Sequence, residues 1–126
     1  MKDKLMVINK YKDLIDKYSK LSLIYPKKYY DLKDKLELVL FTNLKELYII
    51  NSLSNKEKRI IRKEELLGNL KYLNYLFESI NKLNILSDKQ YKSIYIDIEV
   101  IYKYLIGWIN YDKNNRWLFR CIRQSN

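Results

Sequence analysis

Apolar residues recur along the chain at alternating spacings of four and three positions, which is the pattern of one face of an α-helix. The first segment with this pattern runs from Val7 to Tyr25 and is followed by Pro26, the only proline. A proline disfavours the helical conformation in the residue before it. The first helix is therefore predicted to end at Pro26.

The next segment, from about Tyr29 to Asn51, is apolar over a wider arc than one stripe. Phe41 and Tyr48 lie outside the stripe that begins with Leu32. A helix that is apolar around much of its circumference lies at the centre of a bundle or at an oligomer interface. The pattern leaves both alternatives open.

Two further helices are predicted from capping boxes, in which a serine side chain and the side chain three residues later each bond the other's backbone N–H. Ser54 with Glu57 marks the start of the third helix, which ends near Asn84, and Ser87 with Gln90 marks the start of the fourth. The inward-facing residues are predicted to be Leu66, Leu70, Leu73, Phe77 and Ile80 in the third helix, and Tyr91, Ile94, Ile98, Ile101, Leu105 and Trp108 in the fourth.

These four segments and their short polar connections predict an all-α fold, an antiparallel up-down-up-down four-helix bundle formed by residues 1–111. The polar run from Asp112 to Asn115 is predicted to be a turn. Residues 112–126 then form a basic C-terminal tail. No strand-type alternation of apolar and polar residues competes with the helical pattern.

The 126 residues carry a formal net charge of +10, from 25 Lys and Arg against 15 Asp and Glu. Clustered basic residues favour a polyanionic partner, nucleic acid or an anionic membrane surface, because neutralised phosphates release their counterions. The alternative is a charge that serves only solubility, in a lysine-rich protein encoded by an A+T-rich genome. We favour nucleic acid as the partner.

The residue types exclude most catalytic and metal sites. The chain has no histidine, one cysteine and two glycines, so His-based catalysis, an internal disulfide, a cysteine metal cluster and a Gly-rich phosphate loop are not expected. Asp97 and Glu99 are two residues apart on a helix and point in different directions.

No apolar run reaches roughly 18 residues, and the N-terminal residues resemble an amphipathic helix rather than a signal peptide. We therefore expect a non-catalytic, cytoplasmic protein that needs no cofactor and does not enter a membrane.

Three basic clusters are candidate binding sites. Lys27 and Lys28 precede two tyrosines, a combination that suits phosphates beside stacked bases but equally suits a solvated rim. The second cluster, at the start of the third helix, consists of Lys56, Lys58, Arg59, Arg62 and Lys63, of which Arg59, Arg62 and Lys63 are the candidate binding residues. The helix dipole favours acidic residues at that position, so an external anion is the preferred explanation.

The third cluster lies in the predicted tail. Arg116, Arg120 and Arg123 form a helical stripe with aromatic residues between them. Arginine beside aromatic residues suits RNA or DNA, and also a partner protein or an anionic membrane. The alternative is a tail that packs back on the bundle.

Four short motifs, taken in order, resemble a known family. They are Tyr25-Pro26-Lys27, Leu70-Lys71-Tyr72-Leu73, Leu86-Ser87-Asp88-Lys89-Gln90-Tyr91 and Leu105-Ile106-Gly107-Trp108-Ile109. Over about residues 5–111 the chain is similar to the accessory variability determinant proteins of diversity-generating retroelements. A four-helix family encoded by intervening sequences in large-subunit ribosomal RNA genes has a similar layout.

The resemblance implies a four-helix protomer assembled into a pentameric barrel, with a basic surface that binds RNA and DNA. It also implies a complex with the retroelement's reverse transcriptase that supports complementary DNA (cDNA) synthesis from the template-repeat RNA. On the third helix, Lys71 matches the first of two basic residues of the family, while Asn74 and Tyr75 stand near the second. The alternative function is a structural scaffold related to the ribosomal intervening-sequence proteins.

Overall fold

The computed structural model describes the backbone of residues 2–125 and the side chains of residues 3–114. Its elements are α1 (Lys2–Lys20), the short 3-10 helix η1 (Lys27–Tyr29), α2 (Tyr30–Ser52), α3 (Lys56–Lys82) and α4 (Asp88–Ser125). No residue of the described backbone lies in a strand. The prediction of an all-α fold with four helices is therefore confirmed.

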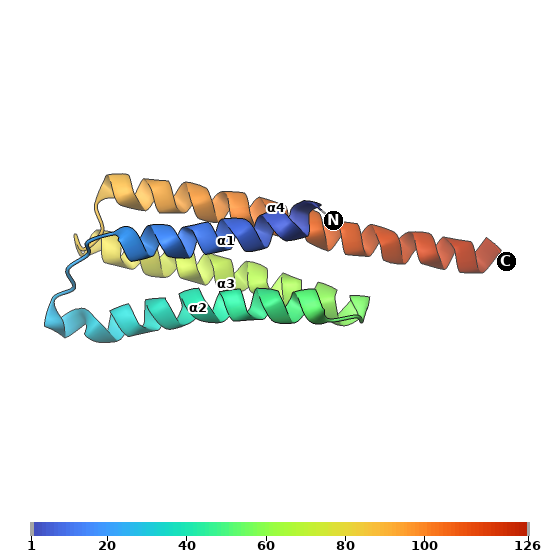
Figure 1. Ribbon diagram of the computed structural model, residues 1–126, viewed down its shortest axis with the longest axis horizontal. Helices are drawn as coiled ribbons and strands as arrows, with labels where there is room; N and C mark the ends of the chain where they lie inside the picture. The colour runs from blue at the N-terminus through green and yellow to red at the C-terminus, as the bar shows by residue number, and fades with distance from the viewer. Residues whose placement is uncertain (1, 126) are drawn as a thin grey trace.

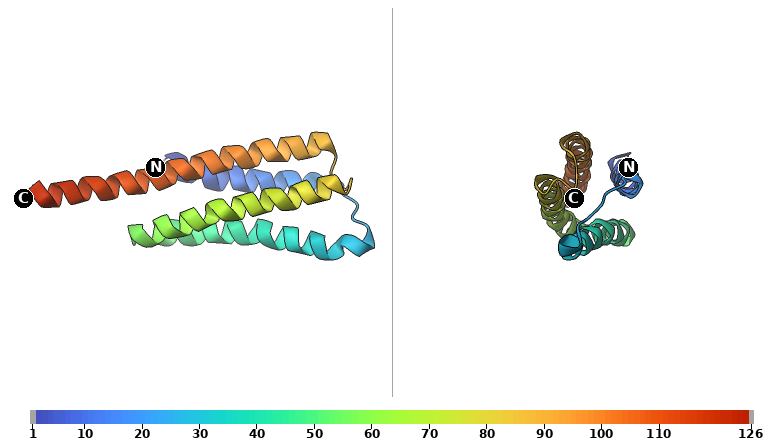
Figure 2. Two further views of the ribbon diagram at one scale, coloured as in Figure 1. Left: turned by 180° about the vertical axis from the view of Figure 1, so that it is seen from behind. Right: turned by 90° about the vertical axis from the view of Figure 1, so that its left-hand side faces the viewer.

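The helices form a ring around one core. α1 lies beside α2 and α4, and α3 lies beside the same two helices, whereas the described backbones of α2 and α4 do not come close together, nor do those of α1 and α3. Figure 1 shows the chain passing along α1, returning along α2, and reversing again into α3 and then α4. The end-on view in Figure 2 shows one helix at each corner of the ring. α2 and α4 therefore lie on opposite sides of the bundle.

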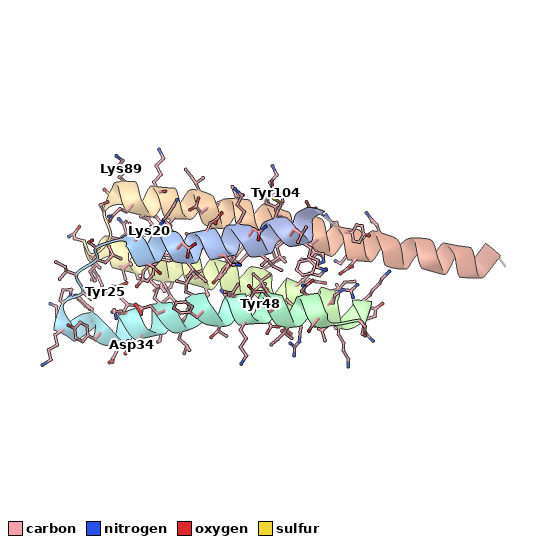
Figure 3. The ribbon with its side chains drawn as sticks, in the orientation of Figure 1. Lys20, Tyr25, Asp34, Tyr48, Lys89 and Tyr104 are labelled. Carbon is pink, nitrogen blue, oxygen red and sulfur yellow. The ribbon has the colours of Figure 1, made fainter. Side chains whose placement is uncertain are left out.

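The residues predicted to face inward form the core. In the third and fourth helices every one of them is buried except Tyr91, which is partly exposed. Polar and charged side chains extend outward from all four helices (Figure 3). Fully buried apolar residues come from each helix and include Val7, Tyr11, Leu14, Leu36, Leu40, Leu47, Leu70, Phe77, Ile94 and Leu105.

The helix starts follow the local sequence, and one capping box is present as predicted. The Ser87 N–H donates to Gln90 Oε1 at 3.0 Å, and the Gln90 N–H donates to Ser87 Oγ at 3.1 Å. At α3 the capping residue is Asn55, whose Oδ1 accepts the Lys58 N–H at 3.0 Å, and not Ser54 as predicted. Asparagine caps a helix as well as serine does, so the start moves by one residue.

α1 ends at Lys20, earlier than the predicted end at Pro26. The chain leaves the helix and folds back, which brings the Tyr25 hydroxyl to 3.0 Å from the Tyr18 hydroxyl. In a continuous helix these two residues would be about 10 Å apart along the axis. Tyr18 also donates to Glu37 of α2 at 2.9 Å, and burial raises the pKa of both phenols. The hydrogen-bonded pair of Tyr18 and the buried Tyr25 therefore outweighs the helical pattern at this point.

α4 continues through the polar segment, so the prediction of a turn from Asp112 to Asn115 is wrong. Asp112 is 2% exposed and forms ion pairs with Arg59 and Lys63 of α3, which hold it in the helix. Residue 112 thus belongs to the bundle, and Figure 1 shows α4 extending beyond the ends of the other helices. The third basic cluster, Arg116, Arg120 and Arg123, has its backbone in this extension. The side chains of these three residues fall outside the described residues.

The wide apolar arc of α2 is divided between the core and the surface. One stripe faces the core, whereas Leu38, Phe41 and Tyr48 are 69, 53 and 48% exposed. A central position within one chain therefore does not explain this arc. The other side of the bundle carries a second exposed apolar stripe, formed by Tyr95, Ile96 and Ile106 of α4.

Candidate nucleic-acid interface

Lys63 is fully buried between α3 and α4. Its Nζ donates to the Trp108 carbonyl oxygen at 3.2 Å, forms an ion pair with Asp112, and lies 4.4 Å from the centre of the Trp108 ring. With no exposed surface, this ammonium group cannot reach a phosphate of a bound nucleic acid. The prediction that Lys63 binds nucleic acid is therefore wrong, and Lys63 is a core residue.

The two arginines of the same cluster also have partners within the chain. Arg59 donates from Nε and Nη2 to the Asp112 carboxylate at 3.2 and 3.1 Å, and from Nη1 to the Leu53 carbonyl oxygen at 2.7 Å. Arg62 donates to Glu46 of α2 at 3.2 Å. The carboxylates of Asp112 and Glu46 therefore take the place of the external anion that the sequence pattern predicts. Of the three candidate residues Arg59, Arg62 and Lys63, only Arg62, whose side chain is 42% exposed, retains substantial surface.

The electrostatics of this buried cluster favour a charged Asp112. Burial alone would raise the pKa of Asp112, but the hydrogen bonds from Arg59 and Lys63 outweigh it and hold that pKa below its usual 3.8. Burial, with the nearby Arg59 charge, lowers the pKa of Lys63 even though Asp112 opposes this change. Asp112 thus joins α4 to α3 through two cations, and the arrangement is structural.

The first candidate cluster lies at one end of the bundle. Lys27 and Lys28 are exposed in η1, and Lys28 Nζ is 5.1 Å from the centre of the Tyr29 ring. The neighbouring Tyr30 is 51% exposed. The end of α1 and the start of α4 lie at the same end, marked by Lys20 and Lys89 in Figure 3.

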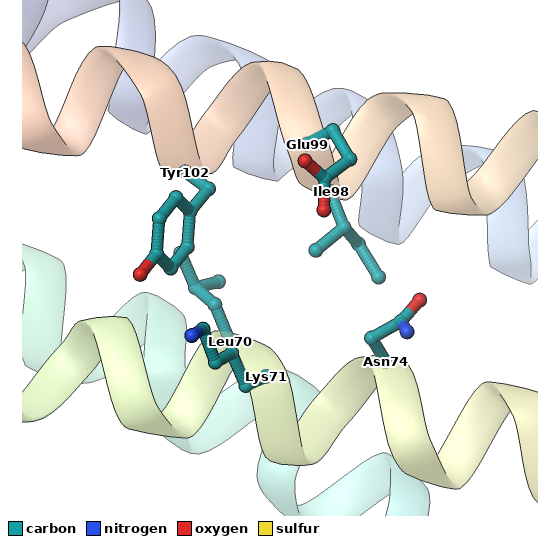
Figure 4. Close-up of a pocket in the computed structure, with 6 residues that line it drawn as sticks. All are labelled: Leu70, Lys71, Asn74, Ile98, Glu99 and Tyr102. Atoms are coloured by element: carbon teal, nitrogen blue, oxygen red, sulfur yellow. The ribbon is translucent and has the colours of Figure 1, made fainter.

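Lys71 lies in a pocket of about 300 Å³ between α3 and α4, which we name the α3–α4 groove. Its ammonium group is 5.5 Å from the centre of the Tyr102 ring. Figure 4 shows these two side chains on one side of the groove and Asn74 with Glu99 on the other. The residues that line the groove are Leu70, Lys71, Asn74, Ile98, Glu99 and Tyr102.

Two more tyrosines continue the aromatic surface of α4 beside this groove. The rings of Tyr91 and Tyr95 have centres 6.2 Å apart, and the Tyr91 hydroxyl donates to Asn74 Oδ1 at 3.4 Å. Tyr91, Tyr95 and Tyr102 lie on one stripe of α4, because residues four and seven positions apart share a helix face. At such a surface the ammonium group can bind a phosphate, and the aromatic rings can stack on unpaired bases.

The predicted site residues whose side chains the structure describes do not lie in one patch. Lys27 and Lys28 lie at one end, Lys71 lies in the α3–α4 groove, and Arg59 with Lys63 lies at the buried junction of α3 and α4. Sequence reasoning missed Tyr102 as a site residue and treated Glu99 only as one of two nearby carboxylates. The spacing of the tyrosines on α4 was the available signal.

Asp97 and Glu99 do point in different directions, as expected. Asp97 pairs with Lys17 of α1 at 2.5 Å, whereas Glu99 lines the α3–α4 groove. Among the residues with described side chains, no group of three potential metal ligands is found. None of the helices, as far as they are described, is both long and apolar enough to cross a membrane.

No protein-family model, curated protein or solved structure matches this chain. The resemblance to accessory variability determinant proteins therefore stays a prediction based on the four motifs.

Proposed function

We propose that this chain is a non-catalytic accessory protein of a diversity-generating retroelement. In this role it works in the cytoplasm and binds the element's reverse transcriptase together with RNA and DNA. The complex supports template-primed, mutagenic cDNA synthesis. The proposal draws on the four sequence motifs, the net charge of +10 and the composition of the α3–α4 groove.

The observation that carries the nucleic-acid part of the proposal is the pairing of Lys71 with tyrosines along the groove. Lys71 is exposed and forms no ion pair with a described residue, so its charge is available to a phosphate. Tyr102 and Tyr91 offer ring faces for base stacking, which is tolerant of sequence. Other exposed lysines without an ion pair among the described residues include Lys27, Lys28, Lys89, Lys92 and Lys103.

The proposed assembly is a pentameric barrel of antiparallel up-down-up-down bundles. Two exposed apolar stripes support self-association, Leu38 with Phe41 on α2 and Tyr95 with Ile96 on α4. They lie on opposite sides of the chain, and a contact between two different surfaces generates a closed ring when its rotation closes. Exposed apolar area of this kind is usually covered by a partner.

Light scattering at micromolar concentration is expected to give the mass of a homo-oligomer for the native chain. The Leu38→Glu, Phe41→Glu double variant should have the mass of a single chain, because it places charges in the interface while leaving the core intact. Lys45→Glu, on the same helix, is the matched control and should remain oligomeric. A native chain that is monomeric under these conditions would contradict the assembly.

Co-expression tests the proposed function directly. A reverse transcriptase of the same retroelement is expected to co-purify with the native chain and to prime specifically on its own RNA only when the chain is present. Binding of the chain to RNA should weaken steeply with salt, because charge neutralisation releases counterions. If RNA does not bind and the enzyme's products do not change, the accessory function fails and a structural scaffold is the better explanation.

A further inference from the structure

The α3–α4 groove contains polar groups that have no partner within the described part of the chain. Glu99 is exposed at the groove and makes no hydrogen bond or ion pair with a described residue. Asn74 uses its Oδ1 to accept the Tyr91 hydroxyl, which leaves its amide N–H groups available. The floor is apolar and consists of Leu70 and Ile98. An apolar floor with a few convergent polar groups is the composition of a small-ligand pocket.

We infer that this groove binds one unpaired guanine base of a single-stranded RNA or DNA. This inference rests on the proposed function and specifies which base the groove selects. The volume of about 300 Å³ lies at the small end of ligand pockets, so it suits one base and not a larger ligand. The ring would lie on the apolar floor beside Tyr102, as bases extruded into pockets stack on aromatic and apolar side chains.

The preference for guanine follows from the Glu99 carboxylate. An ionised carboxylate only accepts hydrogen bonds, and its two oxygens fit a pair of adjacent N–H donors. Guanine offers such a pair on its Watson–Crick edge, N1–H beside the N2 amino group. Adenine, cytosine and uracil each offer donors from a single nitrogen on that edge. The Asn74 amide can then donate to the O6 carbonyl oxygen of the same base.

Lys71 supplies the charge that retains the strand. Its ammonium group stands at Tyr102 on the side of the groove opposite Glu99, as Figure 4 shows. This separation allows Lys71 to contact the phosphate of the bound nucleotide while Glu99 contacts the base edge. The base contact gives selectivity, and the phosphate contact gives affinity that depends on salt.

The test uses fluorescent single-stranded RNAs of about 12 nucleotides, a length within the usual site size for such binding. Each is oligouridine with one central guanosine, inosine or adenosine. For the native chain, the guanosine strand is expected to bind roughly tenfold more tightly than the adenosine strand, with inosine between them because it lacks the N2 amino group.

Variants distinguish the groove from general charge. Glu99→Gln should remove the guanosine preference, and Tyr102→Leu should weaken binding of the guanosine strand by roughly tenfold. Glu65→Gln makes the same charge change on an exposed position of α3 and should keep the preference. If all strands bind equally and Glu99→Gln has no effect, the guanine site is refuted while the proposed function stands. If no strand binds, the guanine site and the nucleic-acid part of the proposed function are both refuted, whereas the complex with the reverse transcriptase is tested separately by co-expression.

Discussion

Asp112→Ala is expected to lower the free energy of unfolding by about 3 to 5 kcal/mol, because removing one partner of a buried ion pair leaves uncompensated charge in the core. Asp112 is the partner of both Lys63 and Arg59, so the substitution leaves two cations without their carboxylate. A domain of this size has a total stability of only about 5 to 15 kcal/mol. Denaturant unfolding followed by circular dichroism measures the loss.

A double variant separates the ion pair from simple packing. Lys63→Met should be destabilising on its own, whereas Lys63→Met with Asp112→Leu should cost less than the sum of the two single changes, because apolar residues of similar volume can replace a buried pair. The matched control is Lys113→Met, next to Asp112 but exposed. A stability change for Asp112→Ala as small as that of the control would refute the buried arrangement.

The contribution of Asp112 to stability depends on pH with a definite sign. The pKa of Asp112 is held below 3.8 in the folded chain, so its contribution to stability is present above that pH. The contribution is lost as the pH falls through the folded-state pKa. The difference in unfolding free energy between the native chain and Asp112→Asn should therefore be constant near neutral pH and shrink in acid below 3.8.

Reversing the charge at three exposed lysines is expected to weaken RNA binding by about 100-fold near 0.1 M salt. The variant is Lys27→Glu, Lys28→Glu, Lys71→Glu, at the candidate positions that the structure leaves exposed. Removing one lysine–phosphate interaction with a single strand weakens binding roughly fivefold at that salt concentration, because fewer counterions are released. Filter binding or fluorescence anisotropy across a salt series measures both the affinity and the slope.

The matched control reverses three exposed lysines elsewhere, Lys10→Glu, Lys12→Glu and Lys45→Glu, and has the same net charge. It should retain most of the affinity. Equal losses in the two triple variants would mean that binding follows net charge alone and that these lysines form no site. Reversal of Arg59 or Lys63 is unsuitable as a binding test, because each is paired with Asp112 and its loss would destabilise the bundle.

The sequence predicts the helices and their inward faces well because both depend on local periodicity. The Ser87–Gln90 capping box is confirmed for the same reason, since its two bonds join residues three positions apart. The periodicity predicts the end of α1 too late. The Tyr25 hydroxyl can bond the Tyr18 hydroxyl only if the chain leaves the helix before Tyr25, and this contact is not visible in the periodicity.

Pairings between distant residues cannot be read from such patterns. Asp112 lies in a polar run typical of a turn, and its partner Lys63 is 49 positions away. The basic residues of α3 look like a binding cluster for the same reason, since the anions that face them come from α2 and α4. The α3–α4 groove likewise joins Lys71 to Tyr102, two residues whose proximity depends on how the helices pack.

The place of α1 beside α4 has a consequence for how the chain folds during synthesis. Lys17 of α1 donates to Ser93 of α4 across 76 positions, so this hydrogen bond closes a loop over most of the chain. α2 with α3, and α3 with α4, are neighbours in sequence and close much shorter loops, which cost less entropy and form faster. The apolar face of α1, with Val7 and Leu14, therefore lacks its main partner until α4 has been made. Of these four helices, the one that is made first is the last to be fully covered.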